Sequence, residues 1–325
     1  FTLFFLALDT YVWQGIKTIT PHWSQRAKSI LKYSYWGYTV FTFVFFLLVR
    51  FQFVPLPAAM VKLLSAIAFA VVIAKLFWVV FLLIDDIIRL FRWIYQYFFT
   101  EVETAPDRPS GISRLKFLQY TGLAVGAAFV GTAIWGIFKG AHNYTIHRKK
   151  IKLAGLPEAF KGLKILQISD IHSGSFWDRE AVAEGIKLIN EQQADVVFFT
   201  GDIVNDRSEE LVPWMDLFSQ IKAPMGVFST LGNHDYGDYV PWPSAAAKKK
   251  NLEDLISYHK QMGWDILNDE HRVLEKDGQK LTIVGVQNWS AKARFPKYGN
   301  LEKALEGAPK DTVKLLLSHD PSHWR

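Results

Sequence analysis

The stretch KILQISDIH, residues 164–172, decides the fold of the second half of the chain. It begins as an apolar run and ends in the carboxylate of Asp170 and the imidazole of His172. The same arrangement recurs in DVVFFTGD, residues 195–202, and in MGVFSTLGNHD, residues 225–235. Continuous apolar runs of this length are typical of strands that are buried on both faces. We therefore expect buried strands that end in chemically active side chains.

Working outward from these runs, the sequence predicts an α/β domain. Strands are expected at residues 164–169, 195–200, 225–231, 264–267, 271–275, 281–286 and 313–318. Helices are expected between the early strands, at residues 179–190, 209–221 and 252–262. The later strands follow one another without intervening helices. A mixed sheet or two packed sheets is therefore favoured over a simple doubly wound sheet.

Polar side chains follow four of the predicted strands. They are Asp170, His172, Asp202, Asn233, His234, Asp235, His319 and Asp320. Each of these residues alone is typical of an ordinary turn, helix cap or surface. In an open α/β sheet, however, the carboxyl ends of the strands meet at one crevice. The eight residues together therefore indicate a functional site. Oxygen and imidazole donors without thiolate suit Mn, Fe or Zn, and a carboxylate can bridge two such ions. Two-metal sites clamp the attacking and leaving oxygens of a displacement at phosphorus.

The motifs D-x-H at 170–172, GD at 201–202, GNHD at 232–235 and SHD at 318–320 closely resemble those of the calcineurin-like metallophosphoesterase family. The resemblance covers about residues 144–325 and is closest to bacterial membrane-anchored envelope enzymes. It implies an αββα sandwich, in which two mixed β-sheets are flanked by helices. It also implies hydrolysis of a phosphoester or pyrophosphate bond.

The resemblance further implies a dinuclear metal site, with Mn as the first choice and Fe or Zn as alternatives. The implied metal ligands are Asp170 and His172 on the first ion, Asp202 between both ions, and Asn233 and His319 on the second ion. His234 is implied as the general acid or transition-state stabiliser, and Asp235 as the residue that orients its ring. The implied reaction is in-line attack on phosphorus by a bridging metal hydroxide.

The ends of the chain depart from the family pattern. The pattern closes with a GHxH motif that supplies one more histidine to each metal, whereas the sequence stops at Arg325 before any such motif. The sequence also starts at Phe1 inside an apolar run. We therefore expect both ends to be truncated.

The first part of the chain is basic and apolar. Residues 1–140 hold 13 Lys and Arg against 6 Asp and Glu, whereas residues 141–325 hold 24 against 25. Basic residues beside long apolar runs are typical of membrane insertion, so no nucleic-acid partner is expected. The 50% hydrophobic composition excludes an intrinsically disordered chain, and the absence of cysteine excludes a disulfide scaffold.

Residues 1–140 are accordingly expected to form a multi-pass transmembrane region, and residues 141–325 the metallophosphoesterase domain. About 20 apolar residues cross a bilayer core as a helix. Four spans are predicted, at about residues 1–16, 31–49, 58–84 and 117–138, with a cleaved signal peptide as the alternative for the first. Asp9 and Lys75 lie at comparable depths in their spans, so an ion pair between them is possible; the alternative is that Lys75 snorkels or faces a polar gap between helices. A transport function would depend on these two residues alone.

The distribution of Lys and Arg in the connections predicts the orientation. The first and third connections are basic and are therefore expected in the cytoplasm, which places residues 141–325 outside it. The basic residues are Lys17, Arg26 and Lys28 in the first connection, and Arg89, Arg92, Arg108, Arg114 and Lys116 in the third. An outward-facing domain on a membrane anchor favours a phosphorylated lipid or cell-envelope substrate, with the bilayer itself as a partner. No pattern in the sequence indicates an oligomeric state.

Two alternatives remain open at this stage. The competing functional class is a membrane receptor or scaffold that uses an incomplete phosphoesterase domain as a binding module. The loop at residues 236–251 follows the third motif and contains Tyr239, Trp242 and three lysines at 248–250. These lysines either contact an anionic leaflet near the site or belong to a solvated helix terminus.

Overall fold

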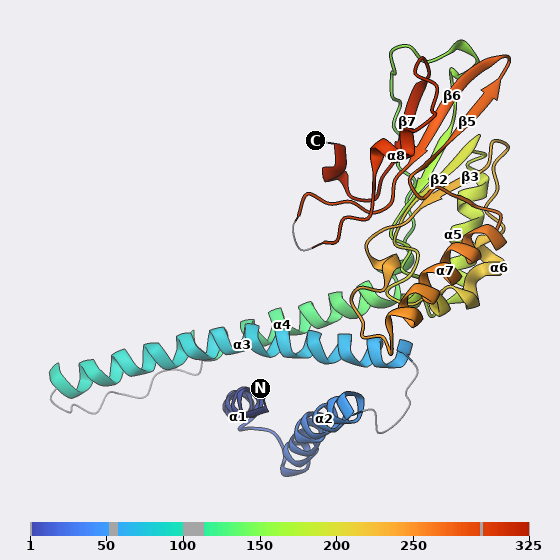
Figure 1. The fold of residues 1–325 in the computed structure, drawn as a ribbon. Helices are drawn as coiled ribbons and strands as arrows, with labels where there is room; N and C mark the ends of the chain where they lie inside the picture. The colour runs from blue at the N-terminus through green and yellow to red at the C-terminus, as the bar shows by residue number, and fades with distance from the viewer. Residues whose placement is uncertain (1, 52–57, 100–113, 293–294, 325) are drawn as a thin grey trace. The chain divides into compact units, whose positions relative to one another are not determined.

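The computed structural model describes residues 2–51, 58–99, 114–292 and 295–324. The chain divides into two compact units, Phe1–Asn143 and Tyr144–Arg325 (Figure 1). The first unit contains the helices α1 (Thr2–Ile19), α2 (Gln25–Phe51), α3 (Ala58–Phe99) and α4 (Arg114–Phe138). The second unit contains the helices α5 (Arg179–Glu191), α6 (Met215–Phe218), α7 (Ala245–Gln261) and α8 (Leu301–Leu305). Its strands are β1 (Ile165–Ile168), β2 (Val196–Thr200), β3 (Val227–Thr230), β4 (Asp265–Ile266), β5 (Glu270–Lys276), β6 (Gln279–Gly285) and β7 (Val313–Leu317).

Three helices in the described part of the chain are long and apolar enough to cross a membrane. They cover residues 25–51, 63–99 and 117–137 and therefore overlap the predicted second, third and fourth spans. The predicted first span corresponds to α1, which is not one of these three helices. The first unit is thus a transmembrane-type region in which four long helices are described.

α3 is longer than the predicted span. It continues as one helix of 42 residues from Ala58 to Phe99. At 1.5 Å per residue this is about 63 Å, about twice the thickness of a bilayer hydrocarbon core. Arg89 and Arg92 consequently lie on this helix and not in a connection, because nothing in the sequence breaks the helix after residue 84. Arg108, from the same predicted connection, lies outside the described residues.

Small residues allow the membrane helices to approach closely. A β-carbon on Gly122 of α4 would lie 2.7 Å from the Phe81 ring of α3, and one on Gly126 would lie 3.1 Å from the Ala74 carbonyl oxygen. A β-carbon on Gly15 of α1 would lie 2.8 Å from Leu82 of α3. Helices in a bilayer associate by such close packing, since lipid tails supply no hydrophobic drive for it.

The predicted Asp9–Lys75 pair is confirmed. The Lys75 ammonium lies 2.5 Å from Oδ1 of Asp9, and both side chains are almost fully buried. Oδ1 also accepts a hydrogen bond from the Tyr35 hydroxyl at 3.1 Å, and Oδ2 accepts one from the Thr39 hydroxyl at 2.9 Å. The carboxylate therefore has a cation from α3 and two hydroxyl donors from α2, which is the arrangement that makes a buried charge tolerable.

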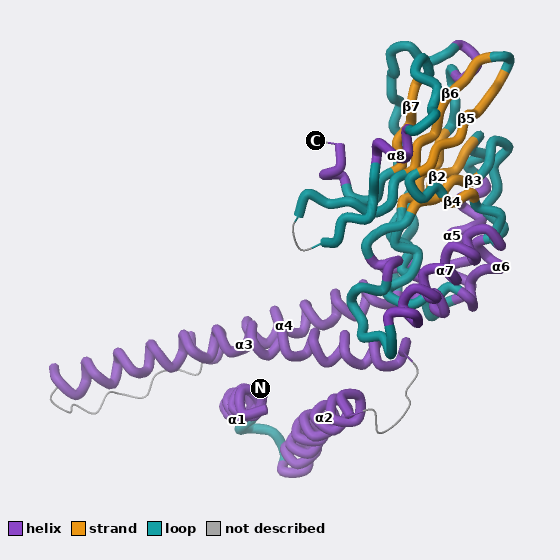
Figure 2. Tube along the Cα trace, viewed as in Figure 1, coloured by secondary structure: helices purple, strands orange, loops and turns teal. Residues whose placement is uncertain are grey.

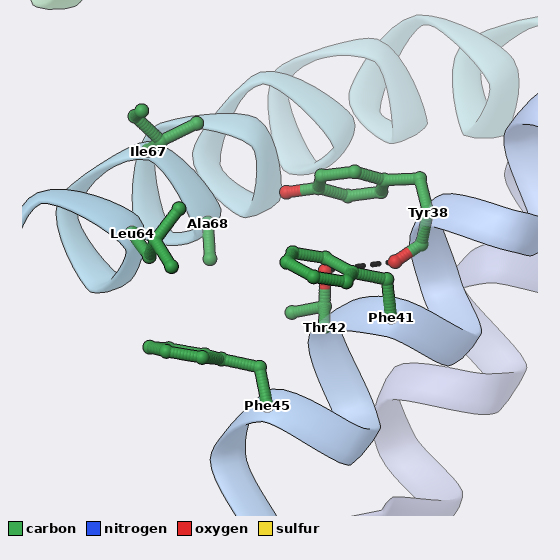
Figure 3. Close-up of a pocket in the computed structure, with 7 residues that line it drawn as sticks. All are labelled: Tyr38, Phe41, Thr42, Phe45, Leu64, Ile67 and Ala68. Carbon is green, nitrogen blue, oxygen red and sulfur yellow. Dashed lines mark hydrogen bonds between the residues drawn. The ribbon is translucent and has the colours of Figure 1, made fainter. Parts of the chain in front are cut away.

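A small apolar cavity of about 30 Å³ lies between α2 and α3. Figure 3 shows the side chains that line it, which come from both helices. They are Tyr38, Phe41, Thr42, Phe45, Leu64, Ile67 and Ala68. The Thr42 hydroxyl donates to the Tyr38 carbonyl oxygen at 2.9 Å, so it is satisfied within its own helix. A gap this small and apolar is a packing defect and not a ligand site.

Two sheets form the centre of the second unit (Figure 2). The first has the order β1-β2-β3-β4, and its three strand pairings are all parallel. The second has the order β5-β6-β7, with one antiparallel and one parallel pairing. The expectation of two mixed sheets is thus correct only for the second. The first sheet is parallel because helical crossovers return the chain to the same end before each new strand.

The layers follow from the alternation of side chains along each strand. In β2, Val197 and Phe199 join the hydrophobic cluster that includes helix residues from α5, α6 and α7. Val196 and Phe198 join a second cluster that contains Ile283 of the other sheet. β2 is therefore buried on both faces, which explains its continuous apolar sequence. A third cluster joins α8 to the strand β6, completing the predicted αββα order.

Two predicted helices differ from the structure. Residues 209–221 form two single turns of 3₁₀-helix and the four-residue α6, because Pro213 lacks the amide proton that a continuous helix needs. α7 begins at Ala245, well before the predicted residue 252, and is capped by the Ser244 hydroxyl, which accepts from the Ala247 amide.

The earlier start of α7 decides between the two interpretations of the lysines at 248–250. All three lie on the helix and pair with carboxylates: Lys248 with Asp238, Lys249 with Glu253, and Lys250 with Asp254. The structure therefore favours the solvated helix terminus.

Candidate metal centre

The site is assembled by the loops that follow β1, β2, β3 and β7. The amide of Asp170 donates to the Gly201 carbonyl oxygen at 3.0 Å, and the amide of His172 donates to the Asp202 carbonyl oxygen at 3.0 Å. These bonds continue the parallel β1–β2 pairing beyond the ends of the strands. They bring the side chains of the first two motifs to the same edge of the sheet, as the sequence predicts.

Three of the candidate residues have left-handed backbone conformations. The φ angles are +55° at Asp170, +49° at His172 and +59° at Asp202. Residues with a β-carbon rarely adopt this region, and such outliers cluster at functional sites. The turns direct these side chains out of the strand direction and toward one another.

Two glycines allow the β2 and β3 loops to touch. A β-carbon on Gly201, whose φ is +94°, would lie 2.4 Å from the Gly232 nitrogen. A β-carbon on Gly232 would lie 2.3 Å from Oδ1 of Asp202. A side chain at position 201 would therefore push the two loops apart, and one at position 232 would displace the Asp202 carboxylate.

Two groups of candidate ligands share the buried Asp202. One contains His172, Asp202 and His234, and the other contains Asp170, Asp202 and His319, with ligand atoms within 4.8 Å of one another in each group. Oδ2 of Asp202 lies 3.6 Å from Nε2 of His172 and 3.4 Å from Nε2 of His319. Ligands bound at about 2.0–2.2 Å around one cation are themselves separated by about this much. The donor set therefore fits divalent cations on either side of Asp202.

Asn233 adds an amide oxygen to the second group. Its Oδ1 lies 3.2 Å from Nε2 of His319. The other ring nitrogen of His319, Nδ1, lies 2.8 Å from the Thr200 carbonyl oxygen. A carbonyl oxygen can only accept, so Nδ1 carries the proton and Nε2 is directed at the site. This is the usual arrangement of a histidine that binds a metal.

The electrostatics of the protein atoms show that the centre favours positive charge. Burial alone would raise the pKa of the Asp202 carboxyl, but the hydrogen bond and charge of His319 hold the pKa below its ordinary value. Burial would lower the pKa of His319, but the hydrogen bond and charge of Asp202 raise it to about 9. A proton on His319 thus occupies the place of a cation beside the buried carboxylate.

The Asp235 carboxylate accepts from backbone amides, whereas the expected partner was the His234 ring. Asp235 is completely buried, and its carboxylate accepts from the amides of Asp202, Ile203 and Gly232 at 2.8–2.9 Å, and from Val204 at 3.4 Å. Burial and the neighbouring Asp202 charge raise the pKa of Asp235 to about 7, although the backbone hydrogen bonds act to lower it. These bonds take the place of the expected contact with the His234 ring, because amides of the loops after β2 and β3 lie within hydrogen-bond distance of the carboxylate.

The His234 ring is instead oriented by Asn205. Nδ1 of His234 lies 2.6 Å from the Asn205 carbonyl oxygen, so Nδ1 carries a proton. The His234 ring meets the His172 ring edge-on at 4.8 Å between centroids. The loop position of Asn205 is itself fixed, since its amide donates to the Glu210 carboxylate at 2.6 Å.

The structure brings together all the predicted metal ligands and His234, but not every predicted strand-end residue. Asp320 turns back on its own segment and accepts from the Ser322 amide at 2.8 Å. Asn205 was not predicted as part of the site, because it acts through its backbone carbonyl, which leaves no signal in the sequence. Tyr239, whose hydroxyl accepts from Nδ2 of Asn233 at 2.8 Å, was placed only near the mouth.

Comparison with known families agrees with this geometry. The family described as "Calcineurin-like phosphoesterase" matches residues 163–325, about half of the chain. The chain belongs to the calcineurin-like phosphoesterase family. Residues 1–141 match a second family, described as "Probable Calcineurin-like phosphoesterase, transmembrane domain". Divalent metals are the cofactors of this family, and the ligand groups around Asp202 are consistent with that chemistry.

Individual relatives carry related names. A "Transmembrane protein with metallophosphoesterase domain" from Danio rerio is 26% identical over 58% of this chain and 42% of its own length. The "Uncharacterized metallophosphoesterase YkuE" of Bacillus subtilis is 32% identical over 65% of this chain and 70% of its own length. The "UDP-2,3-diacylglucosamine pyrophosphatase LpxG" of Chlamydia muridarum is 30% identical over 36% of each chain. This chain therefore spans less than half the length of two of these three relatives.

Proposed function

We propose that this chain is a membrane-bound phosphoesterase that hydrolyses a phosphoester or pyrophosphate bond of a membrane lipid or cell-envelope substrate. The observation that carries the proposal is the buried Asp202, which is shared by two groups of ligand atoms. A shared carboxylate between two cations is the arrangement needed for displacement at phosphorus. The first unit, with its long apolar helices, supplies the membrane attachment.

Five residues would hold the cations in this proposal: Asp170, His172, Asp202, Asn233 and His319. We propose Mn²⁺, with Fe and Zn as alternatives, because the donors are carboxylate, amide and imidazole without thiolate. When bound, two such ions activate water and neutralise the phosphoryl oxygens. Asp202 stays ionised for this task because its pKa is held low.

His234 would donate the proton that the leaving group needs. Nδ1 is fixed on the Asn205 carbonyl oxygen, which leaves Nε2 as the ring atom that faces a reactant. Asp235 would act through the backbone: it accepts from the amides of residues 202 and 203 and so fixes the loop that carries Asp202.

The substrate class rests on two observations. A catalytic unit joined to membrane helices remains close to lipid or lipid-linked substrates, which raises their effective concentration. The Chlamydia muridarum relative is named as a pyrophosphatase of UDP-2,3-diacylglucosamine, an acylated sugar nucleotide. We propose an acylated or lipid-linked phosphate ester for this chain.

The test of the reaction is hydrolysis by the purified full chain in detergent with added Mn²⁺. Phosphomonoester, phosphodiester and lipid pyrophosphate substrates would be compared, and bound metal would be counted. Asp202→Asn should reduce turnover more than 100-fold, since loss of even an outer partner of a metal ligand costs about 10- to 100-fold. The matched control is Asp216→Asn, an exposed carboxylate on α6, which should retain wild-type turnover.

Two results would contradict the proposed reaction. Wild-type turnover in Asp202→Asn would exclude this centre. Folded protein that binds no metal and hydrolyses none of the substrates would favour the receptor or scaffold function instead.

We further propose that the catalytic unit faces away from the cytoplasm, from the basic first and third connections. The chain has no cysteine, so single cysteines can be introduced and labelled in intact cells with a membrane-impermeant maleimide. Glu306→Cys in the catalytic unit should be labelled, and His22→Cys between α1 and α2 should be protected. The reverse pattern would place the catalytic unit in the cytoplasm.

A further inference from the structure

Tyr239 contacts two residues of the proposed centre at once. Its hydroxyl oxygen accepts a hydrogen bond from Nδ2 of Asn233 at 2.8 Å. Its ring centroid lies 4.6 Å from that of the His234 imidazole. Tyr239 is also 47% exposed, so it lies at the open side of the centre and not in the core of the unit.

The bond to Asn233 matters because an amide has two unlike ends. Oδ1 can bind a cation, whereas the Nδ2 hydrogens repel one. With Nδ2 donating to Tyr239, Oδ1 is the end that lies 3.2 Å from Nε2 of His319. An amide rotated by 180° could still bond to Tyr239, because the hydroxyl can also donate, but it would present hydrogens to the cation. The bond to Tyr239 therefore holds the amide beside the centre, where Oδ1 can face the cation.

The ring of Tyr239 restricts the His234 imidazole. The imidazole is held at Nδ1 by the Asn205 carbonyl oxygen and contacts the His172 ring edge-on. Tyr239 adds a third contact, tilted by 45° to the imidazole plane. A proton donor must be held near one geometry to be effective, and packing by a neighbouring ring supplies that restraint.

The loop around Tyr239 is anchored before and after it. Nε1 of Trp242 donates to the Gly237 carbonyl oxygen at 2.7 Å, and the Arg207 guanidinium lies 4.4 Å above the Trp242 ring. Asp238 accepts from the Tyr298 hydroxyl at 2.9 Å and pairs with Lys248 of α7. A residue between two such anchors can hold its neighbours in place.

We propose that Tyr239 is a positioning residue of the metal centre, which holds the Asn233 amide in place beside the cation and restrains the His234 ring. This inference depends on the proposed function, because it assigns a partner to a proposed metal ligand and to the proposed acid. The two actions belong to different parts of the side chain. The hydroxyl acts on Asn233 and the ring acts on His234, so two substitutions separate them.

The experiment titrates Mn²⁺ into the full chain in detergent, measures bound metal by equilibrium dialysis, and measures turnover at each metal concentration. Tyr239→Phe removes the hydroxyl and keeps the ring. Its Mn²⁺ affinity should fall about 10- to 100-fold, as for other outer partners of metal ligands, and its turnover should recover at saturating Mn²⁺. Tyr239→Ala removes both, so its turnover should stay below that of Tyr239→Phe at saturation.

The matched control is Tyr258→Phe on α7, a helix that carries none of the proposed site residues. It should bind Mn²⁺ with wild-type affinity. Wild-type metal affinity in Tyr239→Phe would overturn the action on Asn233, and equal saturated turnover in the two Tyr239 variants would overturn the action on His234. Failure of the wild-type chain itself to bind Mn²⁺ would instead overturn the proposed function, and the inference with it.

Discussion

Both units bury a carboxylate, but they stabilise it in different ways. In the first unit (Phe1–Asn143), the membrane unit, Asp9 is 6% exposed. Its charge is compensated by the side chains of Lys75, Tyr35 and Thr39. In the catalytic unit, Asp235 is 0% exposed and is compensated by backbone amides of the loops after β2 and β3. The backbone amides of a helix donate to carbonyl oxygens of the same helix, whereas amides in loops beyond the strand ends can donate to a side chain. The difference shows that local backbone structure decides which donors a buried charge can recruit.

The largest effect is expected from removing the acceptor in the catalytic unit. Asp235→Leu leaves four amides without their partner, and each buried unsatisfied donor costs about 1–3 kcal/mol. The free energy of unfolding of the catalytic unit should fall by at least about 4 kcal/mol. Pulse proteolysis of the full chain in denaturant measures it. Asp311→Leu, at an exposed carboxylate before β7, is the matched control, and an equal loss there would contradict the backbone role of Asp235.

A smaller effect is expected from removing the cation in the membrane unit. Lys75→Met leaves Asp9 without its countercharge, which should destabilise the helical unit by about 3 kcal/mol. Thermal unfolding in detergent, followed by helical circular dichroism, measures the loss. Adding Asp9→Asn to Lys75→Met should recover most of it, because the uncompensated charge is then gone. If the double variant is no more stable than Lys75→Met, the ion pair is not what Lys75 contributes.

The smallest effect concerns a buried group with a single partner. Nδ1 of His259 lies 2.9 Å from the Ser229 hydroxyl, and burial lowers the pKa of His259 to about 3. Below its ordinary pKa of 6.5 the unfolded chain binds a proton that the folded chain does not. Stability should therefore fall as the pH drops from 6.5 toward 3, by about 1.4 kcal/mol per pH unit.

His259→Gln isolates this dependence. Asp235 acts in the opposite direction, because its raised pKa of about 7 makes stability fall as the pH rises from its ordinary value near 3.8. Denaturant unfolding at pH 7, 6 and 5 measures the free energy of unfolding of both proteins. Between pH 7 and pH 5 the wild type should lose about 2 kcal/mol more than the variant. Parallel curves for the two proteins would show that His259 does not carry the acid sensitivity.

Much of the catalytic fold could be predicted because its signals are local. The apolar runs mark β1, β2, β3, β6 and β7 to within two residues, and the polar residues that follow them meet because parallel strands end at one edge. The Asp9–Lys75 pair could also be predicted, since both partners are ionisable side chains in apolar helices.

The rest could not be predicted because it depends on the backbone or on distant contacts. The acceptor bonds of Asp235 and the carbonyl of Asn205 involve main-chain atoms, which every residue has. The break in the helix predicted at residues 209–221 did have a signal in the sequence, which is Pro213. The continuation of α3 to Phe99 had no such signal, since neither proline nor glycine interrupts residues 85–99.

The left-handed conformations of Asp170, His172 and Asp202 have a consequence for how this protein could evolve. Glycine would adopt the same angles without strain, so backbone strain alone favours glycine at each of these positions. Such a mutation would delete a donor group at the same time. Selection for thermal robustness and selection for turnover therefore oppose each other at these three positions, and stabilising substitutions should be sought away from the crevice.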